Sequence, residues 1–117
     1  MPDALAGPKR GDIWRASLNP TVGHEQSGTR PVLIVSVDSF NDGTAGLVIA
    51  VPITSRSKRI RTHVEVEPPE GGLNFTSYVK CEDVRSISKL RLKERLGTVS
   101  KGTLVEVEDR LRILMAL

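Results

Sequence analysis

Basic and hydroxyl side chains are concentrated in one short segment of the sequence, and such residues bind phosphate groups. Thr54 and Ser55 are followed by four cations, and residues 54–63 contain no acidic side chain. The four cations are Arg56, Lys58, Arg59 and Arg61. Guanidinium and ammonium groups neutralise phosphates, and hydroxyls add hydrogen bonds to the same oxygens. The pattern is typical of a loop that binds a polyanion, and a plain solvent-exposed loop fits the same residues equally well.

Other catalytic patterns in the sequence are weak. His24 and His63 could act as an acid and a base, but an ordinary exposed histidine is the simpler interpretation of each. The sequence does not indicate a metal site, because its clustered acids have no His or Cys at ligand spacing. These acids are Glu65, Glu67, Glu82 and Asp83. The sequence also lacks a glycine-rich phosphate loop and a nucleophile elbow. If the chain is an enzyme, we therefore expect a mechanism that needs neither metal nor cofactor.

Length and composition predict one compact domain. The chain has 117 residues, of which 38% are hydrophobic and 26% charged, and its formal net charge of +3 permits a polyanionic partner without requiring one. The lone Cys81 is expected to be a buried, reduced thiol. No apolar run approaches the ~18 residues of a membrane helix, and no signal peptide is recognisable, so we expect a cytoplasmic protein. Four aromatic residues are too few for a surface that stacks many successive bases.

Short apolar runs separated by turns predict six to seven strands and a closing helix. Residues 1–10 are rich in Ala, Gly and Pro and are expected to form a flexible arm before a domain at residues 11–117. We expect strands at residues 12–18, 32–35, 46–54, 63–67, 77–87 and 96–99. Residues 21–30 should form an exposed loop. The pattern predicts a mainly β protein, a small, strongly curled antiparallel sheet or barrel with a C-terminal helix.

Four local signals refine this prediction. Pro52 lacks an N–H, so the strand should leave the sheet beyond it and present Thr54 and Ser55. Clean alternation places residues 63–67 at a sheet edge. The alternation of residues 77–87 breaks at Glu82 and Asp83, which indicates either a β-bulge or a simple strand end. We expect the closing helix to begin with a capping box in which Thr103 and Glu106 each satisfy a free backbone N–H of the first turn.

Four segments together resemble the MazF/PemK family of toxin endoribonucleases. They are GDIW at residues 11–14, GHEQSGTRP at 23–31, VPITS at 51–55 and CEDVR at 81–85. They occur in the family's order and at compatible spacing from Gly11 to the C-terminus. The resemblance implies an SH3-like barrel of the CcdB/PemK type, a homodimer, and metal-independent, sequence-specific cutting of single-stranded RNA such as mRNA. It also implies growth inhibition through blocked translation, and neutralisation by a co-expressed antitoxin with an acidic, flexible segment.

The resemblance also suggests roles for individual residues. Arg30 matches the family's catalytic arginine and Thr54 its catalytic threonine, and the two should converge on one phosphodiester. Arg30 suits charge stabilisation, because a guanidinium pairs with phosphate oxygens but is a poor general base. Glu25 is a candidate proton acceptor or a partner that holds Arg30, although an exposed loop acid is an equally good interpretation. The remaining candidate RNA-binding residues are Gln26, Ser55, Lys58, Arg59, Glu82 and Asp83.

One departure from the family concerns base recognition. Asp83 stands where the family usually has Gln, and an ionised carboxylate only accepts hydrogen bonds whereas an amide both donates and accepts. The base preference can therefore differ from that of relatives. Two rival functions remain at this point: a CcdB-like toxin that poisons DNA gyrase, and a non-catalytic SH3-like RNA-binding module. The first depends on an aromatic near the C-terminus, and residues 112–117 contain none.

Overall fold

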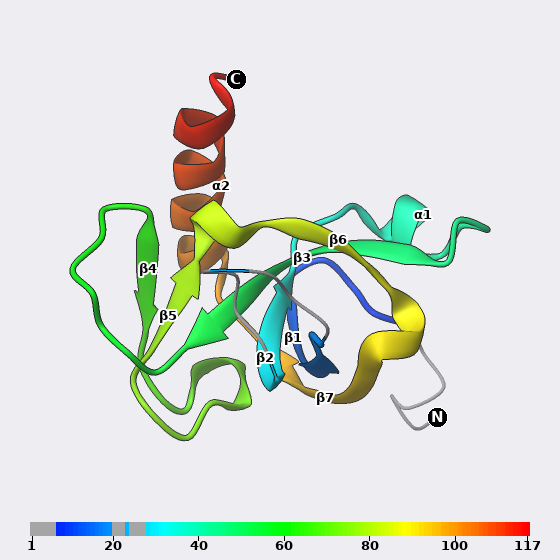
Figure 1. The fold of residues 1–117 in the computed structure, drawn as a ribbon, viewed down its shortest axis with the longest axis horizontal. Helices are drawn as coiled ribbons and strands as arrows, with labels where there is room; N and C mark the ends of the chain where they lie inside the picture. Colours follow the sequence, from blue (N-terminus) through cyan, green and yellow to red (C-terminus); the bar gives the residue numbers. More distant parts are fainter. Residues whose placement is uncertain (1–6, 20–22, 24–27) are drawn as a thin grey trace.

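The protein is a strongly bent antiparallel sheet with a helix packed against it (Figure 1). The computed structural model describes residues 7–19, 23 and 28–117. Its strands are β1 (Asp12–Ser17), β2 (Thr29–Ile34), β3 (Leu47–Thr54), β4 (His63–Val66), β5 (Ser77–Lys80), β6 (Arg85–Ser88) and β7 (Leu92–Thr98). Its helices are α1 (Asp38–Asn41) and α2 (Lys101–Met115). The predicted mainly β fold with a C-terminal helix is confirmed.

The sheet does not close into a barrel. Its strand order is β4-β5-β3-β2-β1-β7, and β6 pairs with β3 beside this path. Within the described residues, β4 and β7 end the sheet and do not pair with each other, so the predicted edge position of residues 63–67 is confirmed. The predicted curled antiparallel fold is therefore present as an open sheet. β2 pairs along one edge of β3, while β6 and then β5 pair along its other edge.

Both faces of β2 and β3 are buried, as the continuous apolar runs predict. Alternate residues of these strands enter two cores. Leu33 and Val51 pack in one core beneath α2, together with the fully buried Val107 of that helix. Val32 and Ala50 pack in the second core on the opposite face. This two-sided burial fixes the register of β2 against β3, since a slip of one residue would exchange the two cores.

The strand β3 continues beyond Pro52, contrary to our prediction. Pro52 pairs with Val32 of β2, and the next two residues pair with β5 as Ile53↔Val79 and Thr54↔Tyr78. On the edge of β3 opposite β2, the pairing with β6 ends at Ala50 and the pairing with β5 begins at Ile53. The proline lies in this gap, where a missing N–H is tolerated. Thr54 remains within the sheet and is only 7% exposed.

The break in the pattern of residues 77–87 is a change of strand. A short 3₁₀ turn at Cys81–Asp83 separates β5 from β6, and these two strands pair with different parts of β3. The predicted bulge is wrong, and the alternative of a strand end is confirmed, because β5 ends at Lys80. The buried Cys81 lies inside the first core, as predicted. The final strand also differs from expectation, because β7 begins at Leu92 rather than near Leu96.

The closing helix begins three residues before the predicted cap. Ser100 is the N-cap, and its Oγ accepts a hydrogen bond from the Thr103 N–H at 3.2 Å. The Thr103 hydroxyl instead donates to Oε2 of Glu70 at 2.5 Å. The predicted capping box at Thr103 and Glu106 is therefore wrong, because tertiary contacts with Glu70 occupy the threonine. The apolar face of the helix is correct, since Leu104 and Leu111 pack on the first core.

Structure begins before Gly11, where the predicted domain starts. The Arg10 N–H donates to Asp38 Oδ1 at 2.8 Å, and its Nε donates to the Val35 carbonyl at 3.1 Å. The same guanidinium forms an ion pair with Glu108 of α2. The first part of the predicted arm, residues 1–6, lies outside the described residues. Among the residues described, no helix is long and apolar enough to cross a membrane.

Candidate functional site

Arg30 and Thr54 are brought to the same place by the register of two neighbouring strands. The pairs between β2 and β3 include Leu33↔Val51 and Val32↔Pro52. Continuing this register by two residues places Arg30 opposite Thr54. The pairing of β2 with β3 ends at Val32↔Pro52, and on the other edge of β3 Thr54 pairs with Tyr78 of β5.

Two hollows meet at this pair of residues, since Arg30 and Thr54 line both. The first, which we call the cationic hollow, has a volume of about 200 Å³. It is lined by Arg30, Thr54, Arg56, Lys58, His63 and Lys80. The second, which we call the aromatic hollow, has a volume of about 330 Å³ and is lined by Ile53, Ser55, Asn74, Phe75 and Leu96, among others. The structure thus brings Arg30 and Thr54 to the same part of the surface.

The two side chains have complementary surroundings. Arg30 is exposed at the rim of the cationic hollow, whereas Thr54 is almost buried at its floor. The Thr54 Oγ1 accepts a hydrogen bond from the Arg56 N–H at 3.2 Å, so its hydroxyl proton remains to be donated. None of the described residues that line the cationic hollow is acidic. The arrangement favours an anion held between a guanidinium and a hydroxyl.

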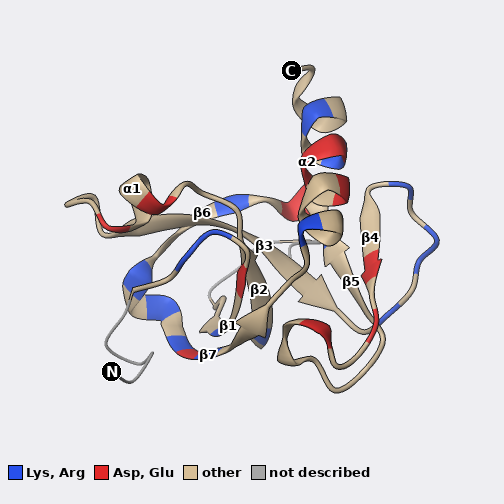
Figure 2. Ribbon diagram, turned by 180° about the vertical axis from the view of Figure 1, so that it is seen from behind, with Lys and Arg blue, Asp and Glu red and all other residues tan. Residues whose placement is uncertain are grey.

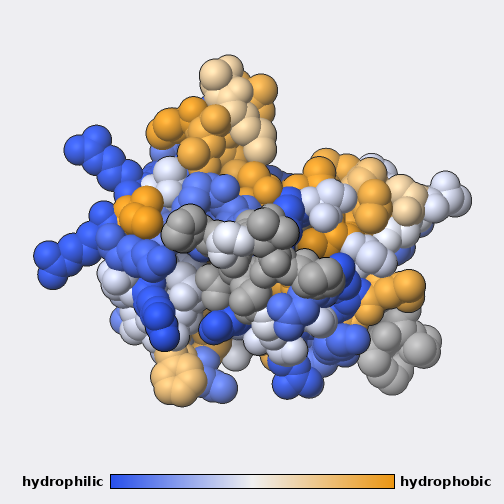
Figure 3. All heavy atoms as spheres, in the orientation of Figure 1, coloured by the Kyte–Doolittle hydropathy of each residue, from blue (hydrophilic) through white to orange (hydrophobic). Residues whose placement is uncertain are grey.

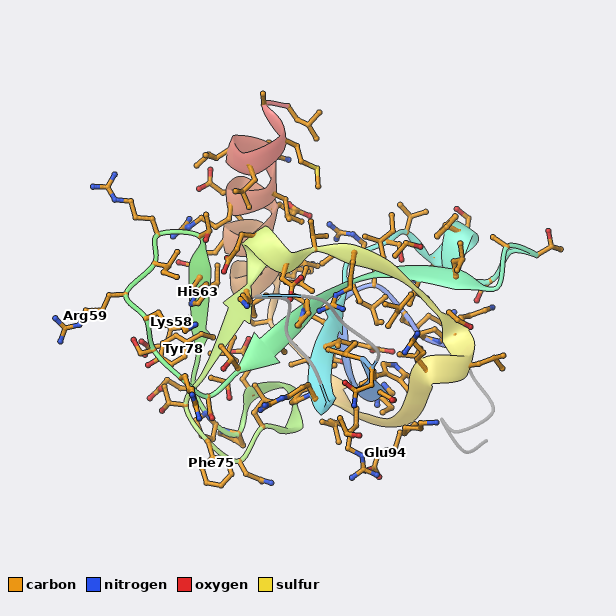
Figure 4. The ribbon with its side chains drawn as sticks, viewed as in Figure 1. Lys58, Arg59, His63, Phe75, Tyr78 and Glu94 are labelled. Carbon is orange, nitrogen blue, oxygen red and sulfur yellow. The ribbon has the colours of Figure 1, made fainter. Side chains whose placement is uncertain are left out.

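The segment of residues 55–62 forms an exposed cationic loop between β3 and β4. Lys and Arg follow one another along it (Figure 2). Lys58 lines the cationic hollow, whereas Arg59 projects away from the body of the protein (Figure 4). At the end of the loop, Arg110 of α2 donates through Nε to the Arg61 carbonyl at 3.0 Å. The loop is therefore fastened to the helix while its cations face solvent and the hollow.

These features agree with the family that the chain matches. A family model described as the PemK-like, MazF-like toxin of type II toxin-antitoxin systems covers residues 9–115. The chain belongs to this toxin family. The endoribonuclease MazF of Staphylococcus epidermidis is 36% identical to it over 110 residues, which are 93% of this chain and 92% of that protein.

Solved structures lead to the same family. A crystal form of MazF from Deinococcus radiodurans superposes on the toxin with a TM-score of 0.85 at 31% identity, covering 95% of this chain and 98% of the other. An endoribonuclease from a Mycobacterial species, solved in complex with its cognate antitoxin, gives a TM-score of 0.76 at 27% identity and covers 97% of each chain. The toxin therefore has the MazF-like fold.

Two predicted RNA-binding acids make internal contacts in the toxin. Glu82 accepts a hydrogen bond from Thr62 Oγ1 at 2.6 Å and is hydrogen-bonded to His63 Nε2 at 2.8 Å. Burial raises the pKa of Glu82, but hydrogen bonds from Thr62, its own N–H and His63 outweigh this and hold the pKa below its usual value. Asp83 pairs with Arg85 at 2.9 Å. Neither acid lines one of the two hollows.

The histidine interpretation needs a correction. The side chain of His63 is only 4% exposed, so it is not the ordinary exposed histidine that the sequence favours. It lines the cationic hollow beneath the loop. Its Nδ1 is buried without a hydrogen-bond partner in the described structure. The cause is antiparallel pairing, because His63↔Lys80 brings the start of β4 beside the turn that carries Glu82.

The remaining site predictions divide into three groups. Ser55 lines the aromatic hollow beside Thr54, so it lies at the site, whereas Arg59 does not. Glu25, Gln26 and His24 lie outside the described residues. The sequence reasoning missed Lys80, Asn74 and Phe75. Lys80 could have been found because it directly precedes the CEDVR segment that resembles the family. Nothing in the sequence marked Asn74 or Phe75 as candidates.

Proposed function

We propose that this toxin is an endoribonuclease that cuts single-stranded RNA, including mRNA, at a short sequence and thereby blocks translation and growth. The observation that carries the proposal is that Arg30 and Thr54 line both hollows at one point of the surface. The activity named for the Staphylococcus epidermidis relative supports it. Since RNA is the substrate, the toxin acts in the cytoplasm.

The chemistry requires three things of the site. They are removal of the 2'-hydroxyl proton, stabilisation of the charge on phosphorus, and a proton for the leaving 5'-oxygen. The neighbouring 2'-hydroxyl loses its proton and attacks phosphorus, the bond to the 5'-oxygen breaks, and that oxygen takes up a proton. The products are a 2',3'-cyclic phosphate and a 5'-hydroxyl end. Arg30 stabilises the charge on the five-coordinate phosphorus, and Thr54 donates its hydroxyl proton to the same phosphate as a hydrogen bond. Glu25 is our candidate for accepting the 2'-hydroxyl proton or for holding Arg30. We propose that no metal or cofactor takes part.

The cationic loop supplies the attraction for the RNA backbone. Arg56 and Lys58 line the cationic hollow beside Arg30, so phosphates next to the cut meet several positive charges together. Glu82 and Asp83 approach the RNA only if their present contacts with His63 and Arg85 are exchanged. Lys58 and Ser55, in contrast, already line the two hollows.

We further propose a homodimer and a cognate antitoxin. Hydrophobic side chains gather on the outer part of α2 (Figure 3), where Ile113 is 68% and Met115 48% exposed. Covering such a surface with a second subunit is favourable. The antitoxin complex of the Mycobacterial relative supports the partner. An acidic, flexible segment of the antitoxin would compete with RNA for the cationic hollow by charge complementarity.

The experiment that tests the proposal is a cleavage assay on long RNA of mixed sequence in the presence of EDTA. We expect discrete cuts whose ends carry 2',3'-cyclic phosphates and 5'-hydroxyls. Intact RNA, or cutting only after Mg²⁺ is added, would overturn the proposed reaction. Gyrase inhibition without any cutting would favour the CcdB-like rival, and RNA binding alone would favour a non-catalytic module.

A further inference from the structure

We propose that the aromatic hollow is a base-binding subsite, in which the ring of Phe75 stacks on a nucleobase adjacent to the scissile phosphodiester and the Asn74 amide binds the edge of that base. The inference rests on the proposed function and adds a specificity determinant to it. Both side chains line the hollow that also contains Arg30 and Thr54. A base held there is therefore next to the phosphate at which the reaction takes place.

The exposure of Phe75 is the first observation. Its side chain is 72% exposed and projects from the connection between β4 and β5 (Figure 4). A single exposed apolar residue is common and means little by itself. Phe75 differs because its ring stands at the rim of a hollow shared with the two proposed catalytic residues. An aromatic ring at such a place offers a face on which any base can stack.

The backbone beneath Phe75 is held firmly on both sides. After it, Ser77 is buried, and its Oγ donates to the Phe75 carbonyl at 2.8 Å. Before it, Leu73 is buried in the first core. Gly72 packs so closely on β7 that a Cβ there would lie 2.0 Å from the Leu96 carbonyl oxygen. A ring presented by an anchored segment loses little freedom when it binds, which favours affinity.

The charges of the two hollows differ, and this difference assigns their occupants. In the cationic hollow, Arg30 is joined by Arg56, Lys58 and Lys80, which suits phosphates. Among the described residues that line the aromatic hollow, the only cation besides Arg30 is Arg15, and its guanidinium is paired with Glu94 at 2.7 Å. The phosphodiester therefore belongs on the cationic side and the base on the aromatic side.

The lining of the aromatic hollow also suits a base. Apolar side chains of Ile53, Leu73 and Leu96 line it together with polar ones. Flat heteroaromatic rings bind against apolar surfaces, while their edges need hydrogen bonds. The Asn74 amide both donates and accepts, so it can distinguish base edges. The volume of the aromatic hollow, about 330 Å³, lies near the lower limit of known ligand pockets. This volume fits one base rather than a folded RNA element.

The test of the stacking uses RNA that contains the mapped cleavage sequence with 2'-deoxyribose at the cut, so that it binds without being cut. Phe75→Ala should weaken binding by about 5- to 150-fold, the range of one lost base stack. Phe75→Trp should retain affinity. Phe40→Ala is the matched control, because Phe40 is also partly exposed but lies on α1, outside both hollows.

The same oligonucleotide with one abasic residue locates the base. At the position whose base stacks on Phe75, Phe75→Ala should cause no further loss of affinity once the base has been removed. At other positions, the loss of affinity from removing the base and the loss from Phe75→Ala should multiply. Asn74→Ala should broaden the sequence preference at that position in cleaved mixed RNA. If the wild-type toxin cuts RNA but Phe75→Ala behaves like Phe40→Ala on every oligonucleotide, the inference is wrong and the proposed function stands. If the wild-type toxin does not cut RNA, both fail.

Discussion

The imidazole Nε2 of His63 lies 2.8 Å from the Glu82 carboxylate, although the two residues are nineteen positions apart in the chain. The contact joins the first residue of β4 to the turn between β5 and β6. Thr62 adds a second hydrogen bond to the same carboxylate. Because the cationic loop ends at these residues, the pair fixes the base of the loop beside Arg30 and Thr54. A contact that the sequence does not reveal thus supports the site.

The first prediction concerns the pH dependence of stability. The pKa of Glu82 is lower in the folded protein than in the unfolded chain. The ionised carboxylate therefore stabilises the fold at pH values above its unfolded pKa of about 4.5. This stabilisation is lost as the pH falls from there through the folded pKa. Glu82→Gln should therefore reduce the loss of unfolding free energy on acidification. Urea denaturation at a series of pH values measures this, with the exposed Glu67→Gln as control. Equal pH slopes in wild type and Glu82→Gln would contradict the prediction.

A second prediction separates two cations of the loop. Each phosphate neutralised on single-stranded RNA contributes about 0.7 to the salt slope of binding. Lys58→Gln should lower the slope by about that amount because Lys58 lines the cationic hollow, whereas Arg59→Gln should change it less. Fluorescence anisotropy with uncleavable RNA between low and moderate salt gives the slopes. A larger effect at Arg59 would mean that RNA runs along the outer side of the loop.

The cap of α2 gives a third prediction. Ser100→Ala removes the side chain that accepts the Thr103 N–H, and loss of such a cap costs about 1 kcal/mol of unfolding free energy. Ser57→Ala, in the exposed loop, should stay within about 0.5 kcal/mol of wild type. Thermal or urea denaturation measures both. An unchanged stability of Ser100→Ala would show that the helix does not depend on this cap.

The thiol of Cys81 gives a fourth prediction. Burial, reinforced by the neighbouring Glu82 charge, raises the pKa of Cys81 to about 12. The thiolate is the reactive form, so the folded toxin should react with a thiol reagent only very slowly at pH 8. The unfolded chain in urea should react at an ordinary rate. Rapid labelling of the folded toxin would indicate that the first core opens readily around this residue.

The strands and helices could be predicted from the sequence better than the candidate site could. Continuous apolar runs such as residues 32–35 identify buried strands, because burial on two faces leaves no room for polar side chains. The turn at Cys81–Asp83 and the cap at Ser100 were missed, because partners distant in sequence decide them. Sequence order alone does not reveal that Thr103 meets Glu70 or that the chain changes neighbours at Pro52.

The same limit applies within the site. Arg30 and Thr54 were found through the family resemblance, and their meeting depends on a strand register that a linear pattern does not contain. Asn74 and Phe75 belong to a connecting segment without a recognisable motif. They become candidates only when the fold places them beside Thr54. His63 was misjudged because the pairing of β4 with β5, which brings it beside Glu82, joins residues distant in sequence.

The central claim is that Arg30 and Thr54 act on one phosphodiester, and a double-mutant cycle of single-turnover cleavage rates in EDTA tests it most directly. Arg30→Ala should lower the rate by about 10²- to 10³-fold, as loss of a group that stabilises transition-state charge does. Lys93→Ala, on the exposed part of β7 and outside both hollows, is the control cation and should be unaffected. Thr54→Val keeps the shape of the side chain and should also slow cleavage.

The decisive value is the coupling between the two changes. Because both groups hold the same phosphate, Thr54→Val should cost much less in the Arg30→Ala background than in wild type. Circular dichroism should show that each variant is folded. Single variants that cleave at the wild-type rate, or losses that simply multiply in the double variant, would contradict the account.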